Sequence, residues 1–402
     1  MSRRFYPQLE GMRAVASLGV LTTHVAFQTR AVAIPVLGPV LGRLDLAVAL
    51  FFGLSGFLLW RPWVAAAHER ADPPSVRRYA MHRFVRIWPA YAVVVAVVLT
   101  LLPDAKNADF TVWLANLTLT QVFVPLSLTA GLTQMWSLSV EVAFYAVLPL
   151  IGFALLGLRG SRVGWRVPAL CALGVLSLGW GPVAATIPHA AGVEPKNWML
   201  GHLPWFVAGL VLAEIAGAVE FDTHRPVPRW LETITRLGAR RWLMLAILVI
   251  AYALACTPLA GPTGLGNLAA WQFAVKMALG AICAFAVLAP LVCGAGPFRL
   301  LTSPVMLALG RWSYGIFIWH LAVLAVVFGL FGIVPFSGNT LLVWMLTVGL
   351  TIGVSAASYA FIEEPCRRWL RDRESRRAID DAGGSATIVE QTVSDTATNA
   401  GN

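Results

Sequence analysis

The sequence predicts an all-α, polytopic integral membrane bundle of about ten transmembrane helices, with both termini in the cytoplasm. Three features indicate this class. Of the 402 residues, 58% are hydrophobic and 12% are charged. In soluble domains about a quarter of all residues are charged. The 16 tryptophans are typical of a chain with many ends near lipid headgroups. This composition excludes an ordinary soluble enzyme and a disordered or fibrous chain.

Ten apolar segments are long enough to cross about 30 Å of hydrocarbon as helices. We expect helices because lipid offers no partner for an unpaired backbone N–H or C=O group. The predicted spans are 12–29, 46–66, 88–103, 137–157, 167–187, 198–216, 242–258, 271–294, 312–334 and 340–362.

The net charge of +10 reflects orientation in the bilayer and not nucleic-acid binding, because the charges lie between the apolar segments. With the N-terminus inside, the inner side receives 24 Lys and Arg residues, Arg61 at the inner end of the second span included, and the outer side receives 4. Arg13 and Lys276 fall within spans. Basic residues concentrate on the cytoplasmic side of membrane proteins. The asymmetry therefore predicts a multi-pass protein of a cell membrane, the bacterial plasma membrane in our interpretation.

Residues 110–130 are apolar enough to be considered as an eleventh span. Such a span would reverse every later segment and leave 9 basic residues inside and 19 outside, against the positive-inside rule. The segment is also rich in Thr and contains Pro125 and Gly131. We therefore predict an outer loop or a re-entrant element.

The chain divides into a membrane domain, residues 1–370, and a tail, residues 371–402. The tail begins with charged residues and continues with Gly, Ala, Ser and Thr, a composition typical of disorder. We expect the tail to be disordered and cytoplasmic.

Arg13 and His24 lie within the first predicted span, where an ionisable group is costly and is a functional candidate. They are eleven positions apart, a separation that brings a helix back to within about 20° of its starting direction and advances it by roughly 16 Å. Both side chains therefore share one stripe, with Arg13 near the cytoplasmic end. Glu10, three residues before Arg13, is placed to pair with it. The alternative is a snorkelling Arg and a structural His.

The fourth span opens with the segment from Gln134 to Glu141, which contains Ser137 and Ser139. Ser137 and Glu141 are four residues apart and share a helix face. Because a carboxylate facing lipid is implausible, we expect Glu141 to point into the bundle, in its outer half. The alternative role is that of a structural hydrogen-bond or ion-pair partner.

The ninth span carries Tyr314 and His320, and His320 is predicted near the depth of His24. It is a second candidate acid, base or substrate ligand, the alternative being a satisfied core His. Lys276 and Glu214 lie near span ends and are predicted to snorkel toward the headgroups.

The inner segment 77–89 interleaves basic and aromatic residues at helical spacing. Arg83 and Arg86 share a face and are candidates for binding phosphates. An interfacial helix on anionic lipid explains the same pattern, and both interpretations stay open.

Taken together, these segments resemble the membrane-bound acyltransferase-3 family. The resemblance rests on six motifs in order between residues 7 and 369: QLEGMRAVASLGVLTTH with Arg13 and His24, FFGLSGFLL at 51–59, RFVRIWPAY at 83–91, WSLSVEVAFY at 136–145, GRWSYGIFIWH at 310–320, and the Glu363-Glu364-Pro365 run.

The resemblance implies an acyltransferase that moves an acyl group, often acetyl, from acyl-CoA to a hydroxyl. It implies acyl-CoA as a co-substrate on the cytoplasmic side, with no permanently bound cofactor and no metal. The implied acceptors are glycans or glycolipids of the cell envelope, or macrolides. His24 suits the role of general base because its ordinary pKa is near neutral.

The remaining candidates follow from that chemistry. Glu141 is expected to orient His24 or the sugar, and Arg13, Ser137 or Tyr314 to stabilise the thioester oxygen. Arg83 and Arg86 are expected to bind coenzyme A phosphates, with Glu10, Ser139, His320 and Glu363 as supporting residues. Whether His24 carries the acyl group covalently or acts only as a base stays open.

Two other classes of protein remain as alternatives. A proton-coupled transporter or flippase of a lipid-linked glycan would use His24, Glu141 and His320 as a proton relay. The absence of similar halves and the basic inner segment argue against it. The third class, a membrane sensor or scaffold, is disfavoured by the short, plain tail.

Overall fold

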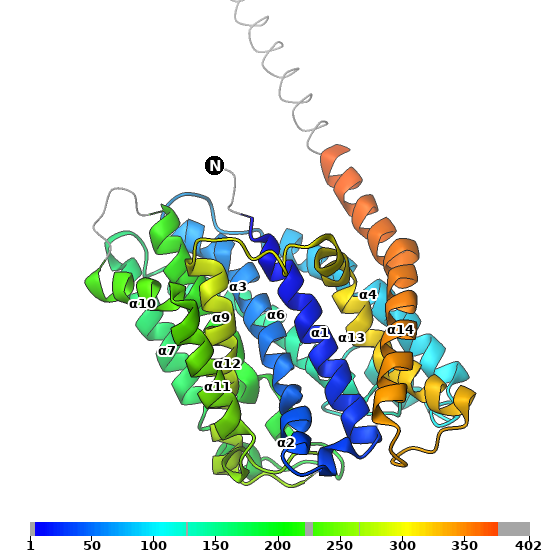
Figure 1. Ribbon diagram of the computed structural model, residues 1–402. Helices are drawn as coiled ribbons and strands as arrows, with labels where there is room; N and C mark the ends of the chain where they lie inside the picture. Colours follow the sequence, from blue (N-terminus) through cyan, green and yellow to red (C-terminus); the bar gives the residue numbers. More distant parts are fainter. Residues whose placement is uncertain (1–4, 126–127, 222–227, 265, 377–402) are drawn as a thin grey trace, which may run out of the picture.

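The computed structural model describes residues 5–125, 128–221, 228–264 and 266–376. Within these ranges the secondary structure is helical and no strand occurs. Figure 1 shows the helices side by side in a bundle, with α1 near its middle in this view. We call the end of the bundle at which α1 begins the proximal end (top in Figure 1) and the opposite end the distal end.

The described helices follow one another in this order: α1 (Pro7–Gln28), α2 (Leu37–Gly42), α3 (Ala47–Ala67), α4 (Val76–Leu101), α5 (Phe110–Leu117), α6 (Trp136–Leu155), α7 (Arg166–Ser177), α8 (Trp180–Thr186), α9 (Met199–Phe221), α10 (Arg229–Ala239), α11 (Arg241–Ala255), α12 (Ala270–Cys293), α13 (Pro304–Phe331) and α14 (Thr340–Ser358). Each of the ten predicted spans coincides with one helix or, for 167–187, with α7 and α8 together.

The described residues contain seven helices that are long and apolar enough to cross a membrane, and up to nine if each of two bent pairs counts as one span. The bent pairs are α7 with α8, at 43°, and α10 with α11, at 79°. α1, the first predicted span, is not among the nine. The protein is therefore a multi-pass membrane protein, and the count of ten stays a prediction.

Glycines allow the central helices to approach closely. A Cβ atom at Gly209 of α9 would lie 1.9 Å from the carbonyl oxygen of Gly53 in α3, and one at Gly310 of α13 would lie 2.2 Å from that of Glu10 in α1. Helices in lipid gain stability from such close contact of small residues, since lipid tails provide no hydrophobic drive for helix association. The two contacts join α9 closely to α3 and α13 closely to α1.

The segment predicted as an outer loop or re-entrant element runs back into the bundle. α5 has only eight residues, too few to span. Its end lies beside the middle of α4, because the Tyr91 hydroxyl donates to the Asn116 carbonyl at 2.7 Å and the Trp88 indole donates to the Leu117 carbonyl at 3.2 Å. The Gln121 amide then donates to the Met135 carbonyl at 3.1 Å. α6 consequently begins at this depth and not at the distal surface.

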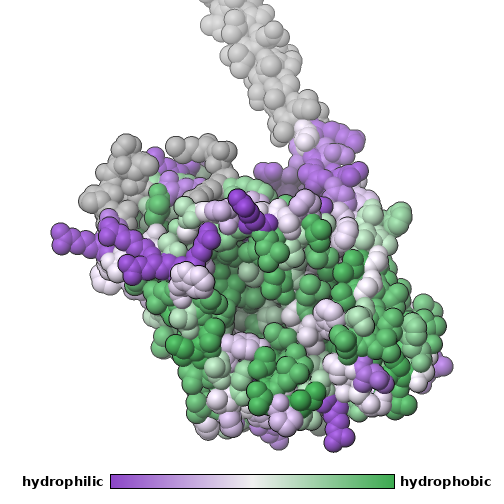
Figure 2. Space-filling model, in the orientation of Figure 1, coloured by the Kyte–Doolittle hydropathy of each residue, from purple (hydrophilic) through white to green (hydrophobic). Residues whose placement is uncertain are grey.

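The surface is divided as a bilayer requires. Figure 2 shows apolar residues over the middle of this face and hydrophilic residues gathered toward the two ends, including the C-terminal helix. After α14 a π-helical turn, Tyr359–Glu363, leads into further helix, which the structure describes as far as Arg376. Residues 371–376, predicted as the start of a disordered tail, thus continue the helix, and the rest of that prediction lies outside the described residues.

The snorkelling prediction for Glu214 is wrong. Its carboxylate is buried and accepts hydrogen bonds from the Arg166 guanidinium at 2.7 Å and from the Trp60 indole at 2.6 Å. Arg166 is itself fully buried. The Glu214 carboxylate has partners inside the bundle and does not snorkel to the headgroups. Its ion pair with Arg166 joins α9 to α7, and its hydrogen bond from Trp60 joins α9 to α3.

Candidate active site

A large cavity of about 1570 Å³ occupies the distal half of the bundle. α1, α4, α12 and α13 contribute to its walls, together with loop residues at the distal end such as Gly264, Gly266 and Asn267. The polar groups that line it include His24, Asp45, His202 and Lys276. The volume exceeds that of ordinary small-molecule pockets, roughly 300–1,000 Å³. The cavity therefore has room for a large ligand.

His24 lines this cavity and lies beside His320. The centroids of the two imidazole rings are 5.2 Å apart, with an angle of 41° between the ring planes. His24 is half-buried, whereas His320 is fully buried. The sequence placed these two side chains at a similar depth on different spans, and the structure brings them into contact.

The hydrogen bonds of His320 determine its tautomer. Its Nδ1 atom lies 2.7 Å from the carbonyl oxygen of Phe317 and 3.2 Å from that of Ile316. Because carbonyl oxygens only accept, Nδ1 carries the proton and Nε2 is an acceptor in the neutral ring. This Nε2 atom is buried and has no hydrogen-bond partner among the described residues. It is thus available to the neighbouring imidazole.

A second, much smaller pocket of about 60 Å³ lies nearer the proximal end. Its polar lining consists of residues from five helices: Arg13, Ser55, Arg86, Ser137, Glu141, Tyr145, Ser313 and Tyr314. The ion pair predicted for Arg13 and Glu10 is present, at 3.8 Å. Five of the six sequence motifs therefore meet in this pocket, through Arg13, Ser55, Arg86, Glu141 and Tyr314.

Aromatic side chains separate the two cavities. Phe51 and Phe317 line the small pocket, and their ring centroids lie 5.9 Å apart. On the other side, Phe317 lies 6.1 Å from the ring of His320. Val48 lines both cavities. We call Phe51 and Phe317 the aromatic partition.

Glu141 lies in the small pocket and not beside His24, so its predicted position in the outer half is wrong. Its carboxylate accepts hydrogen bonds from the hydroxyls of Ser55 and Tyr145, the latter at 2.5 Å. The Tyr79 hydroxyl, near the start of α4, donates to the Tyr145 carbonyl at 3.1 Å. The physical reason is the re-entrant segment, which moves the start of α6 inward.

Arg83 and Arg86 both point into the bundle and not into a cytoplasmic loop. Arg86 lines the small pocket. Arg83 is mostly buried, with its guanidinium carbon 6.0 Å from the centre of the Tyr145 ring and its Nε atom without a hydrogen-bond partner in the described structure. The two guanidinium groups therefore concentrate positive charge at the proximal pocket.

The other predicted residues have more limited roles in the geometry. The Tyr314 hydroxyl donates to the Ile87 carbonyl at 2.8 Å, and the Ser137 hydroxyl to the Gln134 carbonyl at 3.1 Å. Ser139 and Glu363 are buried and line neither cavity. Each retains a buried oxygen without a partner in the described part of the chain.

Sequence reasoning missed two features of the large cavity. Lys276, predicted to snorkel, donates to the Asp45 carboxylate at 2.6 Å, and both residues line the cavity. His202 is buried beside Trp136, with ring centroids 5.0 Å apart. The acidic residue directly before the second span was the available signal for the ion pair. Nothing in the local sequence distinguishes His202.

Comparison with known proteins identifies the chain. The family model for acyltransferase 3, described as an acyltransferase domain, matches residues 6–360. This chain belongs to the acyltransferase-3 family. The family membership establishes an acyltransferase enzyme, as the motifs indicated, and argues against the transporter and sensor alternatives.

Two relatives illustrate the range of the family. The chain is 28% identical over 412 residues to Acyltransferase MdmB of Streptomyces mycarofaciens, covering 94% of this chain and 96% of that protein. It is 24% identical over 385 residues to Peptidoglycan O-acetyltransferase OatA of Listeria monocytogenes, covering 91% of this chain but only 56% of that protein. No solved structure matches the chain. The acyltransferase-3 members named here support O-acyl transfer as the chemistry.

Proposed function

We propose that this acyltransferase-3 protein transfers an acyl group, most simply acetyl, from acyl-CoA to a hydroxyl of an acceptor bound in the large cavity. The observation that carries the proposal is that His24 lines that cavity with the ring of the buried His320 packed against it. In the reaction, the acceptor oxygen attacks the thioester carbonyl carbon and the C–S bond breaks. The hydroxyl proton passes to His24 and then to the departing thiolate, so that coenzyme A leaves as the thiol.

The tautomer of His320 supports this role for His24. The Nε2 atom of His320, beside the His24 ring, is an acceptor that no described residue fills. We expect a donor N–H of His24 to turn toward it in the reaction, which leaves the other nitrogen of His24 unprotonated for the acceptor hydroxyl. This is the arrangement by which a second group orients a general base. The same free nitrogen can instead attack the thioester and carry the acyl group. Acid quenching followed by peptide mass spectrometry distinguishes the two routes by an acylated His24.

The donor is assigned to the proximal side, which the charge asymmetry of the sequence predicts to be cytoplasmic. Arg13 and Arg86 provide positive charge in the small pocket, where they suit the phosphates or the thioester end of acyl-CoA. Arg13 lies about 16 Å of helical rise from His24, so we assign it to donor binding and no longer to the oxyanion at His24. The thioester reaches His24 when Phe51 and Phe317 of the aromatic partition move aside.

The acceptor is assigned to the distal cavity. Its wall combines the aromatic side chains of Trp136, Trp205 and Phe273 with the Asp45–Lys276 ion pair. Flat apolar faces next to charged hydrogen-bonding groups suit a polyhydroxylated ring. The printed name of one relative, a peptidoglycan O-acetyltransferase, points the same way. We therefore favour a carbohydrate or glycolipid of the cell envelope over a macrolide as the acceptor class.

The test uses the full chain in nanodiscs with radiolabelled acetyl-CoA and an envelope extract from a bacterial strain that lacks the gene. We expect release of free coenzyme A that depends on the extract, and label in the carbohydrate-containing fraction. Release of the label by mild alkali would identify an O-ester. Coenzyme A release that is no faster than in protein-free nanodiscs would contradict the donor assignment.

A further inference from the structure

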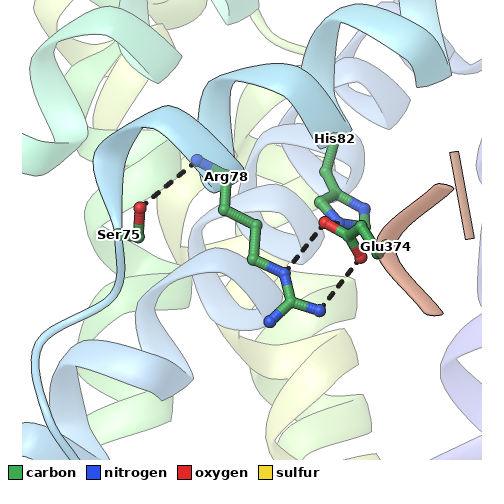
Figure 3. A network of polar contacts seen from close by, with 4 residues as sticks. All are labelled: Ser75, Arg78, His82 and Glu374. Atoms are coloured by element: carbon green, nitrogen blue, oxygen red, sulfur yellow. Dashed lines mark hydrogen bonds and ion pairs between the residues drawn. The ribbon is translucent and has the colours of Figure 1, made fainter. Parts of the chain in front are cut away.

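The helix that follows the π-helical turn places a carboxylate on the first turns of α4. Ser75 caps α4 by accepting from the Arg78 amide. The guanidinium of Arg78 donates two hydrogen bonds to the Glu374 carboxylate, from Nε to Oε1 and from a terminal nitrogen to Oε2, both at 3.0 Å. Figure 3 shows that His82 points at the same carboxylate, and its Nε2 atom lies 3.0 Å from Oε1.

The two residues that hold Glu374 belong to a longer row of basic groups. Arg78, His82 and Arg86 follow one another at intervals of four residues, so they share one face of α4. The Arg78 side chain is 68% exposed, whereas Arg86 lines the small pocket. Over about 12 Å of helical rise, this basic row leads from the proximal surface to the pocket assigned to the donor.

The geometry of the contact is that of anion recognition. A guanidinium that binds both oxygens of a carboxylate presents the same fork to two oxygens of a phosphate. The ion pair is partly exposed, and exposed ion pairs contribute little to stability. A phosphate with up to two negative charges is therefore able to replace the carboxylate at these two side chains.

We propose that Arg78 and His82 form a phosphate subsite for the nucleotide end of acyl-CoA, and that Glu374 occupies it as an internal carboxylate until the donor binds. This inference rests on the proposed function for its choice of acyl-CoA. It assigns to the C-terminal helix a role in donor affinity: Glu374 competes with the donor phosphates, and its release exposes the full basic row on α4.

The test measures binding of coenzyme A to the full chain in phosphatidylcholine nanodiscs by microscale thermophoresis. Because removing an exposed competing charge changes binding only modestly, we expect Glu374→Gln to lower the Kd about two- to five-fold. Arg78→Gln should raise the Kd and remove the benefit of Glu374→Gln in the double variant. Arg77→Gln, the same change on a different face of α4, should have a smaller effect than Arg78→Gln.

A second control distinguishes competition between Glu374 and the donor phosphates from a purely structural role of Glu374. Glu364 pairs with Arg368 and Arg371 of its own helix, so Glu364→Gln removes a carboxylate from this helix without touching α4. It should leave the Kd unchanged. If Glu374→Gln leaves the Kd for coenzyme A unchanged or raises it, Glu374 only holds the C-terminal helix against α4 and the proposal fails.

Two further probes separate this inference from the donor assignment and from lipid. Pyrophosphate alone should also bind more tightly to Glu374→Gln, and this result would support the subsite even if wild-type protein does not release coenzyme A from acetyl-CoA. The measurement is repeated in nanodiscs with phosphatidylglycerol. If Glu374→Gln changes the preference for that lipid and not coenzyme A or pyrophosphate binding, the site holds a lipid headgroup and the proposal is overturned.

Discussion

The imidazole ring of His24, which lines a cavity of about 1570 Å³, lies with its centroid 5.2 Å from that of the buried His320. They come from α1 and α13, which the chain separates by almost 300 residues. His320 spends its Nδ1 proton on the Phe317 carbonyl and so presents a buried acceptor to His24. In the proposed function, this acceptor orients His24 as the base, which gives a role to a polar residue that is costly in lipid.

Replacement of His320 by Phe should therefore lower kcat while leaving the KM for acetyl-CoA near its wild-type value. The ring volume is kept, and only the acceptor that orients His24 is lost. Partners that orient a functional His typically contribute about 10–100-fold. Steady-state kinetics over a pH series would check this, and a His320→Phe enzyme with wild-type kcat would show that His24 needs no partner.

Arg86→Gln should raise the KM for acetyl-CoA about ten-fold or more, because hydrogen bonds to charged groups contribute about 1.5–3 kcal/mol. The KM for the acceptor should not change, since the acceptor is assigned to the other cavity. Arg162→Gln, the same change at an exposed position, is the matched control. Equal effects of the two substitutions would mean that Arg86 serves only general electrostatics or membrane insertion.

The buried Arg166–Glu214 pair gives a prediction on stability that is independent of catalysis. Arg166→Met leaves a buried carboxylate without its cation and should cost about 3–5 kcal/mol. The double variant Arg166→Met/Glu214→Gln removes both charges and should recover most of the loss. Thermal unfolding in one detergent measures both. Additive losses in the double variant would show that the two groups do not stabilise each other.

The orientation of the bundle is open to a labelling experiment. In a Cys-free background, Lys106→Cys should react with a membrane-impermeant maleimide in intact cells, because residue 106 follows the distal end of α4. Arg229→Cys, at the start of α10, should react only after permeabilisation. We expect this result because the predicted topology has 24 Lys and Arg residues on the inner side and 4 on the outer side. Labelling of position 229 in intact cells would invert the assignment of donor and acceptor sides.

Much of the fold follows from the sequence, because apolar length is what a bilayer selects. The helices coincide with the predicted segments, and the pairing of Glu10 with Arg13 follows from their spacing. The depth of Glu141 did not follow. A hydropathy segment is assumed to begin at the surface, whereas α6 begins beside Tyr91, after a re-entrant segment that residues 110–121 form through hydrogen bonds to α4 and to Met135.

The candidate site, too, was predictable from the sequence only in part. Its residue types were predictable, since Arg, His and Glu are costly in lipid, and so was the similar depth of His24 and His320. The division into two cavities was not predictable, because it depends on the side-chain packing of Phe51 and Phe317. Nor was the Asp45–Lys276 pair, whose members are 231 residues apart.

The central claim is that His24 moves the proton, or carries the acyl group, during transfer to an acceptor hydroxyl. The most direct measurement is the rate of acceptor-dependent coenzyme A release from acetyl-CoA by purified wild-type, His24→Ala and His189→Ala proteins in nanodiscs. His189 is exposed and bonds only locally, to the Ile187 carbonyl. We expect His189→Ala to match wild type and His24→Ala to lose about 10²–10⁴-fold in kcat with an unchanged unfolding temperature. A correctly folded His24→Ala protein with near-wild-type kcat would contradict the account.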